Sequence, residues 1–334
     1  MEMRGYLARK SVYLAITLFA IIAFNFFLFR IMPGDPTRVL VPKGADEHLR
    51  DMIKAKFHLN DPLGTQFYYY LIQVFTLDFG ISASKWKWAN ISDGLPTPLF
   101  NTILLVGTGT VFSIWWGVAL GRFAAWRRGK LADTVGMAFA LTFYSMPTFL
   151  FALVMLMVFS GELRWFPLRG AYGSIPFVSN PPSYDDMSIT EKIISRMYHM
   201  VLPVLAFTIE MMAGYSLIVR NSLTDVLTED YIVTARAKGL SNKALLHDHA
   251  MRNAMLPLVT VIAIGIGWVL GGDIMVELVF SYEGLGLLTW DAVNLRDFPL
   301  LQAIFLIMAI AVLVANFVAD ILYMYLDPRV TISR

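Results

Sequence analysis

The sequence contains no cysteine among its 334 residues, so it can form neither a disulfide framework nor a catalytic thiolate. Charged residues are scarce as well, because Asp, Glu, Lys and Arg make up 16% of the chain, against about 25% in an ordinary soluble domain. The net charge is only +2, which gives no reason to expect a nucleic-acid partner. Apolar residues dominate instead, at 57% with a mean hydropathy of +0.60. We therefore expect a protein that lies within a lipid bilayer.

Motifs for chemistry are also missing from the sequence. No segment matches G-x-x-x-x-G-K-[ST], so the chain has no phosphate-binding loop and must take energy for any active process from a partner. Neither G-x-S-x-G nor H-E-x-x-H occurs. His247 and His249 are two positions apart and would point in different directions on a helix, so we expect no metal site. These absences predict that the chain is not an enzyme.

Long apolar runs predict membrane-spanning helices. Five runs contain no Asp, Glu, Lys or Arg, and a sixth, 197–219, contains only Glu210. Each is long enough for a helix of about 20 residues, the length that crosses the hydrocarbon core. The five uncharged runs are 11–29, 94–121, 134–161, 253–272 and 298–319. The expected fold class is an all-α membrane protein with six transmembrane helices.

The basic residues predict which side of the membrane each connection faces. About half of the 27 basic residues lie in the N-terminal segment, the loops 122–131 and 220–252, and the C-terminal tail. Cytoplasmic loops carry an excess of Lys and Arg. We therefore expect these segments, including both termini, on the cytoplasmic side.

A polar segment between two long apolar runs, residues 228–257, predicts two short helices joined by a sharp turn. Gly239 suits the left-handed position that ends a helix, and Leu240 can then fold back onto the last turn. Ser241 is placed to cap the next helix. We expect this segment to be a cytoplasmic handle that a partner protein can bind.

The same segment resembles that of a known family. Its runs TARAKGL at 234–240 and HAMRN at 249–253 are similar to the Glu-Ala-Ala loop of binding-protein-dependent ABC importer permeases, in the variant of the dipeptide and oligopeptide branch. The Glu of that family falls on Val233, and its later Leu-Pro pair falls on Met251 and Arg252. Further matches in the same order are MPGDP at 32–36, VELVFS at 276–281, GLG at 284–286 and LDPR at 326–329.

The resemblance implies a type I ABC importer permease fold in the inner (cytoplasmic) membrane, with N and C termini in the cytoplasm. It implies as partners a homologous second permease subunit, two cytoplasmic ATPase subunits that bind ATP and Mg²⁺, and an extracytoplasmic substrate-binding protein, besides membrane lipid. The chain would carry no cofactor of its own. Carried over residue by residue, the resemblance assigns ATPase coupling to Thr234, Ala235, Arg236, Lys238 and Gly239.

The cargo stays open at this point. Di- and oligopeptides are the default of the family, but permeases of the same branch also carry short oligosaccharides, and some carry nickel. A hypothesis of another class is an intramembrane enzyme or proton-coupled carrier that uses Glu210, Asp273 and Asp320. It predicts activity in the purified chain alone, whereas a permease subunit is inert without its ATPases.

Three residues are candidates for the solute path. An ionisable side chain at membrane depth is costly and normally faces a cavity or a partner, which singles out Glu210. Ser145 and Pro147 lie where a proline frees a backbone carbonyl within the third apolar run. The alternative readings are a buried structural carboxyl for Glu210 and a plain bend at Pro147.

Gly117 and Gly121 have the spacing of small residues that lets two helix backbones approach closely. This pair predicts close packing, either inside the helix bundle of this chain or at an interface between subunits.

The chain divides into three predicted parts. Residues 1–98 comprise the first transmembrane helix and an extracytoplasmic lid segment. Residues 99–326 comprise the transmembrane core with five helices and the cytoplasmic coupling loop at 220–254. Residues 327–334 form a cytoplasmic tail.

Two outer segments complete the prediction. Within 33–93 we expect helices at 46–59 and 66–77, which form a lid that either covers the helix ends or seats a partner. The loop 162–196 is rich in Pro, Ser and Tyr and predicts only a short helix, at 189–197.

Overall fold

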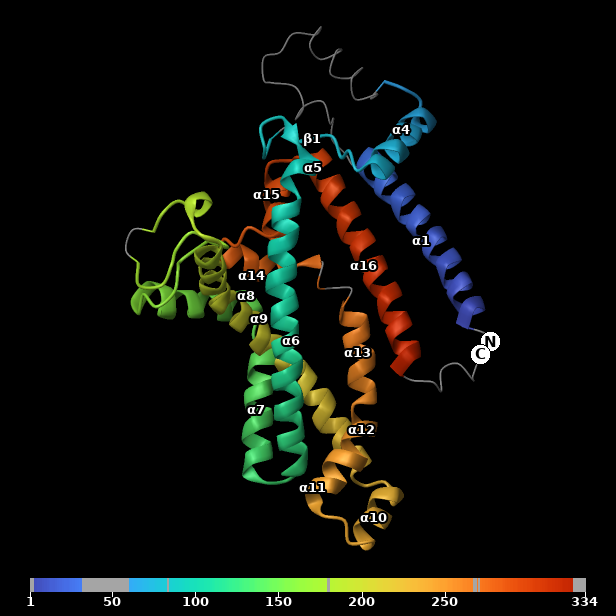
Figure 1. The fold of residues 1–334 in the computed structure, drawn as a ribbon, viewed down its shortest axis with the longest axis vertical. Helices are drawn as coiled ribbons and strands as arrows, with labels where there is room; N and C mark the ends of the chain where they lie inside the picture. Colours follow the sequence, from blue (N-terminus) through green and yellow to red (C-terminus); the bar gives the residue numbers. More distant parts are fainter. Residues whose placement is uncertain are drawn as a thin grey trace. The chain divides into compact units, whose positions relative to one another are not determined.

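The computed structural model describes residues 3–31, 60–82, 84–178, 181–266, 269 and 271–326 (Figure 1). Apart from one pair of two-residue strands, the regular elements in these residues are helical, as the sequence predicts. The chain forms two compact units. The first joins Met1–Asn101 to Glu283–Arg334, and the second is Thr102–Tyr282.

The first unit contains the first and the last helix of the chain. Helices α1 and α16 lie side by side, and α4 packs against α1. In chain order its elements are α1 (Met3–Ile31), α4 (Leu63–Thr76), β1 (Ile81–Ser82), β2 (Ala89–Asn90), α5 (Ile91–Gly94), the first turns of α6 (Pro96–Trp126), α15 (Leu285–Asn294) and α16 (Phe298–Leu326). The strands pair antiparallel, with Ile81 opposite Asn90.

Aromatic contacts hold α4 to α1. The Phe67 ring of α4 lies 5.2 Å from the Phe26 ring and 6.2 Å from the Phe19 ring. Helix α1 is apolar on every side, because Phe26 is buried while Ile16 and Phe24 are 62% and 69% exposed. A helix that is apolar all round suits a membrane span. The predicted helix at 66–77 is confirmed as α4, which begins three residues earlier.

The second unit contains the longest helix, α9, and the polar segment singled out by the sequence. In chain order its elements are the rest of α6, α7 (Leu131–Ser145), α8 (Thr148–Met155), the π-helix η1 (Leu156–Glu162), the 3₁₀ turn η2 (Tyr184–Asp186), α9 (Ile189–Val226), α10 (Asp230–Ala237), α11 (Asn242–Ala244), the π-helix η3 (Leu245–Ala250), α12 (Met251–Ala254), α13 (Leu256–Ile266) and α14 (Ile274–Val279).

Glycines of α6 pack against α9 within this chain. A Cβ atom on Gly117 would lie 2.7 Å from the Tyr215 Cβ, and one on Gly121 would lie 2.5 Å from the Ser216 carbonyl oxygen. Both distances are too short for any other residue to fit without movement. The Gly117-x-x-x-Gly121 pair therefore packs inside the bundle of this chain, which decides between the two predicted locations.

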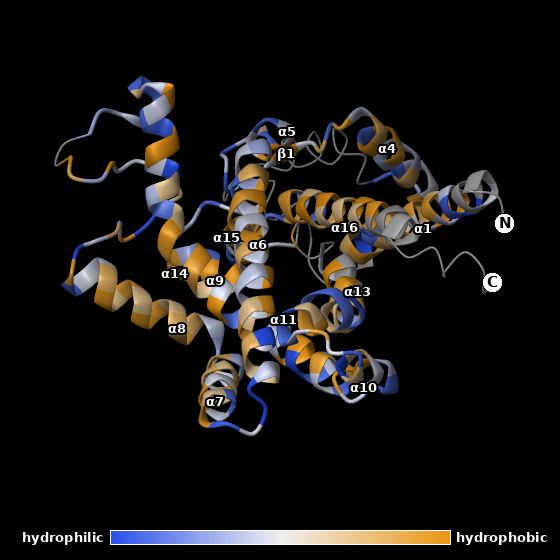
Figure 2. Ribbon diagram, turned by 60° about the horizontal axis from the view of Figure 1, so that its bottom comes forward, coloured by the Kyte–Doolittle hydropathy of each residue, from blue (hydrophilic) through white to orange (hydrophobic). Residues whose placement is uncertain are grey.

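Four helices in the described residues are long and apolar enough to cross a membrane, namely Arg9–Arg30, Ile91–Trp126, Ile189–Val226 and Phe298–Val318. Figure 2 shows apolar residues spread along α8 and α16. The pair Leu131–Ser145 and Thr148–Glu162 passes the same test together but is bent by 100°, so up to five spans are present.

The third apolar run, 134–161, is broken at Pro147, where the sequence predicts a bend. Helix α7 ends at Ser145, Met146 is extended at φ −84° and ψ 131°, and α8 begins after Pro147. Proline lacks an N–H group and disfavours a helical residue before it, which explains the break. The predicted short helix at 189–197 needs correction, because these residues are the first turns of the 38-residue helix α9.

Several sequence predictions fall outside the described residues. These are the MPGDP motif, the helix at 46–59, most of the LDPR motif and the side chain of Asp320. In the described residues, the fifth apolar run forms α13 over Leu256–Ile266.

Candidate functional site

Helix α10 ends in the turn that the sequence predicts. The Gly239 N–H donates to the Arg236 carbonyl at 3.0 Å, and the Leu240 N–H donates to the Ala235 carbonyl at 3.4 Å. These two bonds are those of a Schellman motif, in which the residue after the cap is left-handed. Gly239 has φ +81°, a conformation that glycine adopts without the steric cost of a side chain.

The helix that follows begins at Ser241, whose hydroxyl accepts a hydrogen bond from the Ala244 N–H at 3.3 Å. The predicted N-cap is thus confirmed. The backbone then widens into the π-helical stretch η3 before α12. Helices α10 and α12 are joined by a hydrogen bond of 2.8 Å from the Asn253 amide to the Tyr231 hydroxyl.

One face of this segment is buried against the ends of α6 and α9. We call the buried residues the handle cluster: Ala125, Leu223, Ile232, Ala235, Leu245, Ala250 and Ala254. Leu240 packs on its edge. The handle is therefore attached to α6 through Ala125 and to α9 through Leu223, and it is not a free loop.

The predicted coupling residues divide into an anchor and an outer face. Ala235 is 8% exposed and belongs to the handle cluster. Thr234, Arg236, Lys238 and Gly239 are exposed. Val233, which stands where the resembling family has Glu, is 58% exposed. The segment thus offers an open surface with three cations, Arg236, Lys238 and Lys243, and no acidic residue between 231 and 247.

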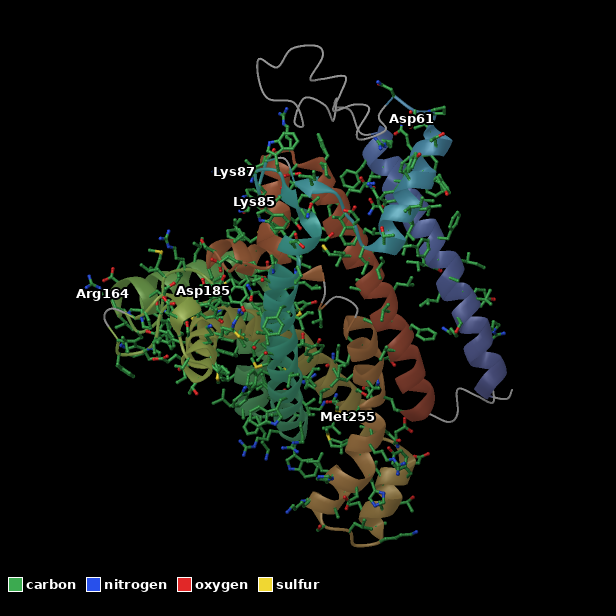
Figure 3. All side chains as sticks on the ribbon, turned by 45° about the horizontal axis from the view of Figure 1, so that its top comes forward. Asp61, Lys85, Lys87, Arg164, Asp185 and Met255 are labelled. Carbon is green, nitrogen blue, oxygen red and sulfur yellow. The ribbon has the colours of Figure 1, made fainter. Side chains whose placement is uncertain are left out.

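A hollow of about 260 Å³ opens beside the handle and is lined by Arg122, His247, Met251, Arg252 and Met255. Figure 3 labels Met255 at this part of the chain. Sequence reasoning did not single out Arg122 or Met255 for this position. The two residues are far apart in the sequence. They meet only because the folded chain brings the end of α6 close to α12.

A buried ion pair fixes α9 to α7 just before the handle. Arg220 donates from Nη2 to Asp133 Oδ2 at 2.9 Å and from Nε to Oδ1 at 3.2 Å. The Gly129 N–H also donates to Asp133 Oδ2, at 3.1 Å. Asp133 is 4% exposed, whereas the Arg220 side chain is 27% exposed. The paired ends of α7 and α9 therefore form a rigid base for the handle.

The candidate solute-path residues are brought together only in part. The Glu210 carboxyl of α9 lies near the side chain of Thr148, the residue after Pro147. Its Oε2 atom is buried and has no hydrogen-bond partner in the described part of the chain. Asp273 lies near enough to interact with Glu210 electrostatically. Ser145 and Pro147 are exposed at the break between α7 and α8.

Thr148 was missed by sequence reasoning, although it directly follows the predicted kink.

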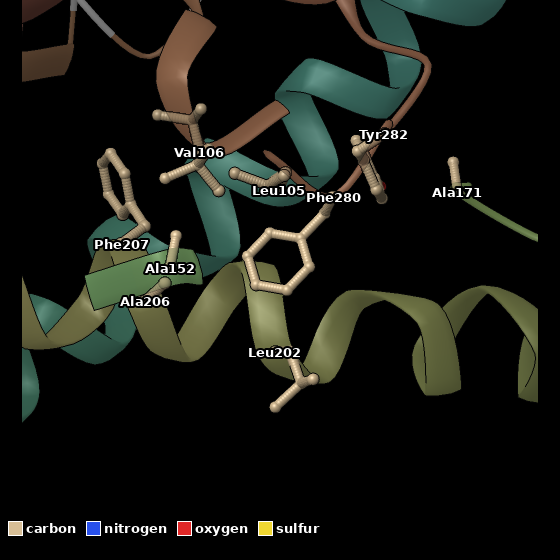
Figure 4. Packing of buried hydrophobic residues seen from close by; sticks show 10 residues of the cluster. Leu105, Val106, Ala152, Ala171, Leu202, Ala206, Phe207, Phe280 and Tyr282 are labelled. Carbon is tan, nitrogen blue, oxygen red and sulfur yellow. The ribbon is translucent and has the colours of Figure 1, made fainter. Parts of the chain in front are cut away.

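Asp273 caps α14 by accepting from the Met275 and Val276 N–H groups at 3.0 and 3.1 Å. Glu210 and Asp273 thus sit where α8, α9 and α14 converge. The packing of these helices is drawn in Figure 4, where Ala152, Leu202 and Phe280 meet in one apolar cluster.

Two family models match the sequence. Residues 117–332 match the binding-protein-dependent transport system inner membrane component, and residues 3–89 match the N-terminal part of such membrane components. The glutathione transport system permease protein GsiC of Salmonella choleraesuis (strain SC-B67) is 32% identical over 328 residues, which are 98% of this chain and 99% of the relative. GsiC of Escherichia coli (strain K12) is 32% identical over the same length and with the same coverage.

A solved structure is similar in fold. A chain from the inward-facing MetNI methionine ABC transporter superimposes with a TM-score of 0.51, covering 70% of this chain and 96% of that chain. The sequence identity is 15%, so this likeness concerns the fold alone.

Proposed function

Because the chain belongs to the family of binding-protein-dependent transport system inner membrane components, we propose that it forms one half of the translocation path of an ATP-driven importer and couples that path to cytoplasmic ATPase subunits. A membrane component of this kind carries the path and leaves ATP binding to its partners. The absence of a phosphate-binding motif from the sequence agrees with this division of labour.

The observation that carries the proposal is the construction of the handle. A helix that ends in a Schellman turn is anchored by Ala235 while Arg236 and Lys238 stay exposed. The anchor reaches α6 and α9, and α9 also carries Glu210. A displacement imposed on the exposed face is therefore transmitted to a helix that lines the proposed path.

The proposed assembly contains a homologous second permease, two ATPase subunits that hold ATP and Mg²⁺, and an extracytoplasmic binding protein. We place six spans in this chain, counting the bent pair α7 and α8 as one and the run around α13 as another. Both termini then lie in the cytoplasm, in agreement with the distribution of basic residues.

We propose a peptide-like solute. The similarity to GsiC, a glutathione transport system permease, supports a small peptide. Two carboxyl groups near each other, those of Glu210 and Asp273, are compatible with a peptide solute. They would attract the ammonium group that a peptide carries at neutral pH.

Reconstitution of the whole transporter tests the proposal. Proteoliposomes that contain both permeases and both ATPases should transport labelled glutathione only under two conditions. ATP must be present on the side of the membrane that carries the ATPase subunits, and the binding protein must be present on the opposite side. The purified chain alone should show neither uptake nor catalysis. Uptake by this chain alone, driven by a proton gradient, would replace the proposal with a proton-coupled carrier.

A further inference from the structure

The segment that follows η1 is bound to the first turns of α9. We call residues 165–174 the outer strap, because they belong to the loop 162–196 that the sequence predicts on the outer side. The Tyr198 hydroxyl of α9 donates to the Trp165 carbonyl at 2.9 Å. The Gly173 N–H donates to the buried Ser195 hydroxyl at 2.9 Å. Residues three apart are neighbours on a helix surface, so the strap is attached along one face of α9.

A third attachment uses both nitrogens of one imidazole ring. His199 of α9 is 5% exposed. The Ser174 N–H donates to its Nε2 at 3.0 Å, and its Nδ1 lies 2.9 Å from the Gly170 carbonyl oxygen. Since a backbone N–H can only donate, Nε2 is the unprotonated nitrogen and Nδ1 carries the hydrogen that is donated to Gly170. The two bonds therefore fit the neutral form of His199, in one tautomer.

The strap also connects α9 to the end of α14. Ala171 has no exposed surface and packs in one apolar cluster with Leu202 of α9 and Phe280, the residue after α14 (Figure 4). The Gly170 N–H donates to the Phe280 carbonyl at 3.0 Å. Helix α9 and the cap of α14 carry the two carboxyl groups that the proposed function assigns to a peptide solute. The strap therefore joins the two helices that position these groups.

We propose that His199 is a positioning residue for solute uptake, which holds the strap on α9 and α14 while its ring is neutral and releases it in an acidic medium. The inference rests on the proposed function, which supplies the uptake and the outer location of the strap. A second proton on the ring would occupy Nε2 and point at the Ser174 N–H. Two donors cannot form a hydrogen bond with each other, so the bond to Ser174 is lost when the ring is charged.

The charged neighbours of this site have contacts of their own. Arg196 donates from Nε to the Tyr184 hydroxyl at 2.6 Å, and its Cζ lies 5.0 Å from the centre of the Tyr172 ring. Glu277 of α14 is buried and accepts from the Thr102 hydroxyl at 2.7 Å. Helix α8, which also packs on α9, has no titratable residue. The other titratable residues on the strap, on the first six turns of α9 and on α14 with its flanks are Arg169, Glu191, Lys192, Tyr198, Glu210, Asp273 and Tyr282.

Histidine is the side chain that ordinarily changes its charge between pH 5 and 8, and His199 is the one histidine in the described residues of these elements. An acid response of the strap is therefore assigned to its ring, and the assignment is tested by replacing that ring alone.

The test measures uptake by the reconstituted transporter while the pH on the side of the binding protein is lowered from about 7 to about 5. We expect the wild-type rate to fall at least about fivefold, the effect of losing one buried hydrogen bond. His199→Gln offers an amide oxygen that accepts from the Ser174 N–H at every pH. This variant should keep most of the uptake at neutral pH and lose the acid response. Effects of acid on the solute and on the binding protein are common to both proteins and cancel in the ratio of their rates.

Ser195→Ala is the matched control. It removes the bond of the strap to Gly173, a bond that involves no group titrating in this range. Uptake should fall by a similar factor at every pH, and the pH at which the rate is halved should stay that of the wild type. If His199→Gln also lowers uptake equally at every pH and keeps the acid response, the ring has a structural role only and the proposal is wrong.

Release of the strap is measured without transport by hydrogen–deuterium exchange of the complete transporter in nanodiscs. After correction for the intrinsic effect of pH on exchange, the protection of the amides at 170–174 should fall in acid in the wild type and not in His199→Gln. Unchanged protection in the wild type would overturn the inference, even where ATP-driven uptake is normal and the proposed function stands. Lost protection in a transporter that takes up no solute would instead overturn the proposed function and leave the release of the strap established.

Discussion

Gly121 and Ser216 bring the backbones of α6 and α9 into direct contact, since a Cβ atom on Gly121 would lie 2.5 Å from the Ser216 carbonyl oxygen. The handle cluster begins four residues further along α6, at Ala125, and includes Leu223 of α9. A backbone contact of this kind cannot be relieved by a side-chain rotation. The two helices that hold the handle therefore move together.

Replacing Gly121 by Val should destabilise the chain by about 1–3 kcal/mol, because the new side chain must push against the Ser216 backbone. Thermal unfolding of the purified protein in detergent measures the loss. Gly136→Ala is the matched control, since a Cβ there would meet a Leu120 methyl group at an ordinary 3.5 Å. Equal melting temperatures for the Val variant and the wild type would show that α6 and α9 are not in this contact in solution.

Gly239→Val should abolish stimulation of ATP hydrolysis by the binding protein while the chain still inserts into the membrane. No atom lies within 4 Å of a Cβ at this position, so the cost arises from the positive φ and amounts to about 1–2 kcal/mol at the turn. Gly239→Asn is the control, because Asn tolerates this conformation and should retain most coupling. Full coupling in the Val variant would contradict the role assigned to the turn.

Asp133→Ala should destabilise the second unit by about 1–3 kcal/mol, because it leaves Arg220 without its carboxylate partner. The expected cost is below that of a fully buried pair, since the Arg220 side chain is 27% exposed and water can solvate it. A double-mutant cycle with Arg220→Ala measures the coupling between the two side chains. A coupling energy of zero would mean that the pair contributes nothing to the base of the handle.

Glu210→Gln should raise the peptide concentration for half-maximal uptake by about tenfold, the loss expected for one charged hydrogen-bonding group. Thr148→Val removes the hydroxyl that lies near this carboxyl and should have a smaller effect in the same direction. Uptake by proteoliposomes over a range of peptide concentrations and pH values is the measurement. If rate, affinity and pH dependence all stay unchanged, Glu210 is a structural carboxyl.

The sequence predicted the local features of the handle correctly. The turn at Gly239 and the cap at Ser241 depend on backbone preferences of single residues and their nearest neighbours, and the structure confirms both. The break at Pro147 was expected only as a kink. Its 100° bend depends on the packing of α8, which no residue near Pro147 specifies.

Only the tertiary structure decided which residues far apart in the sequence are in contact. Ser82 and Asp297 are 215 positions apart, Arg220 and Asp133 are 87 apart, and neither pair has a signal in the sequence. The apolar runs and the handle were determined by the sequence itself, because membrane partitioning and helix capping act over one helix or one turn. Which carboxylate receives which donor, and which glycine faces which helix, depends on the packing of whole helices, and only the folded chain establishes it.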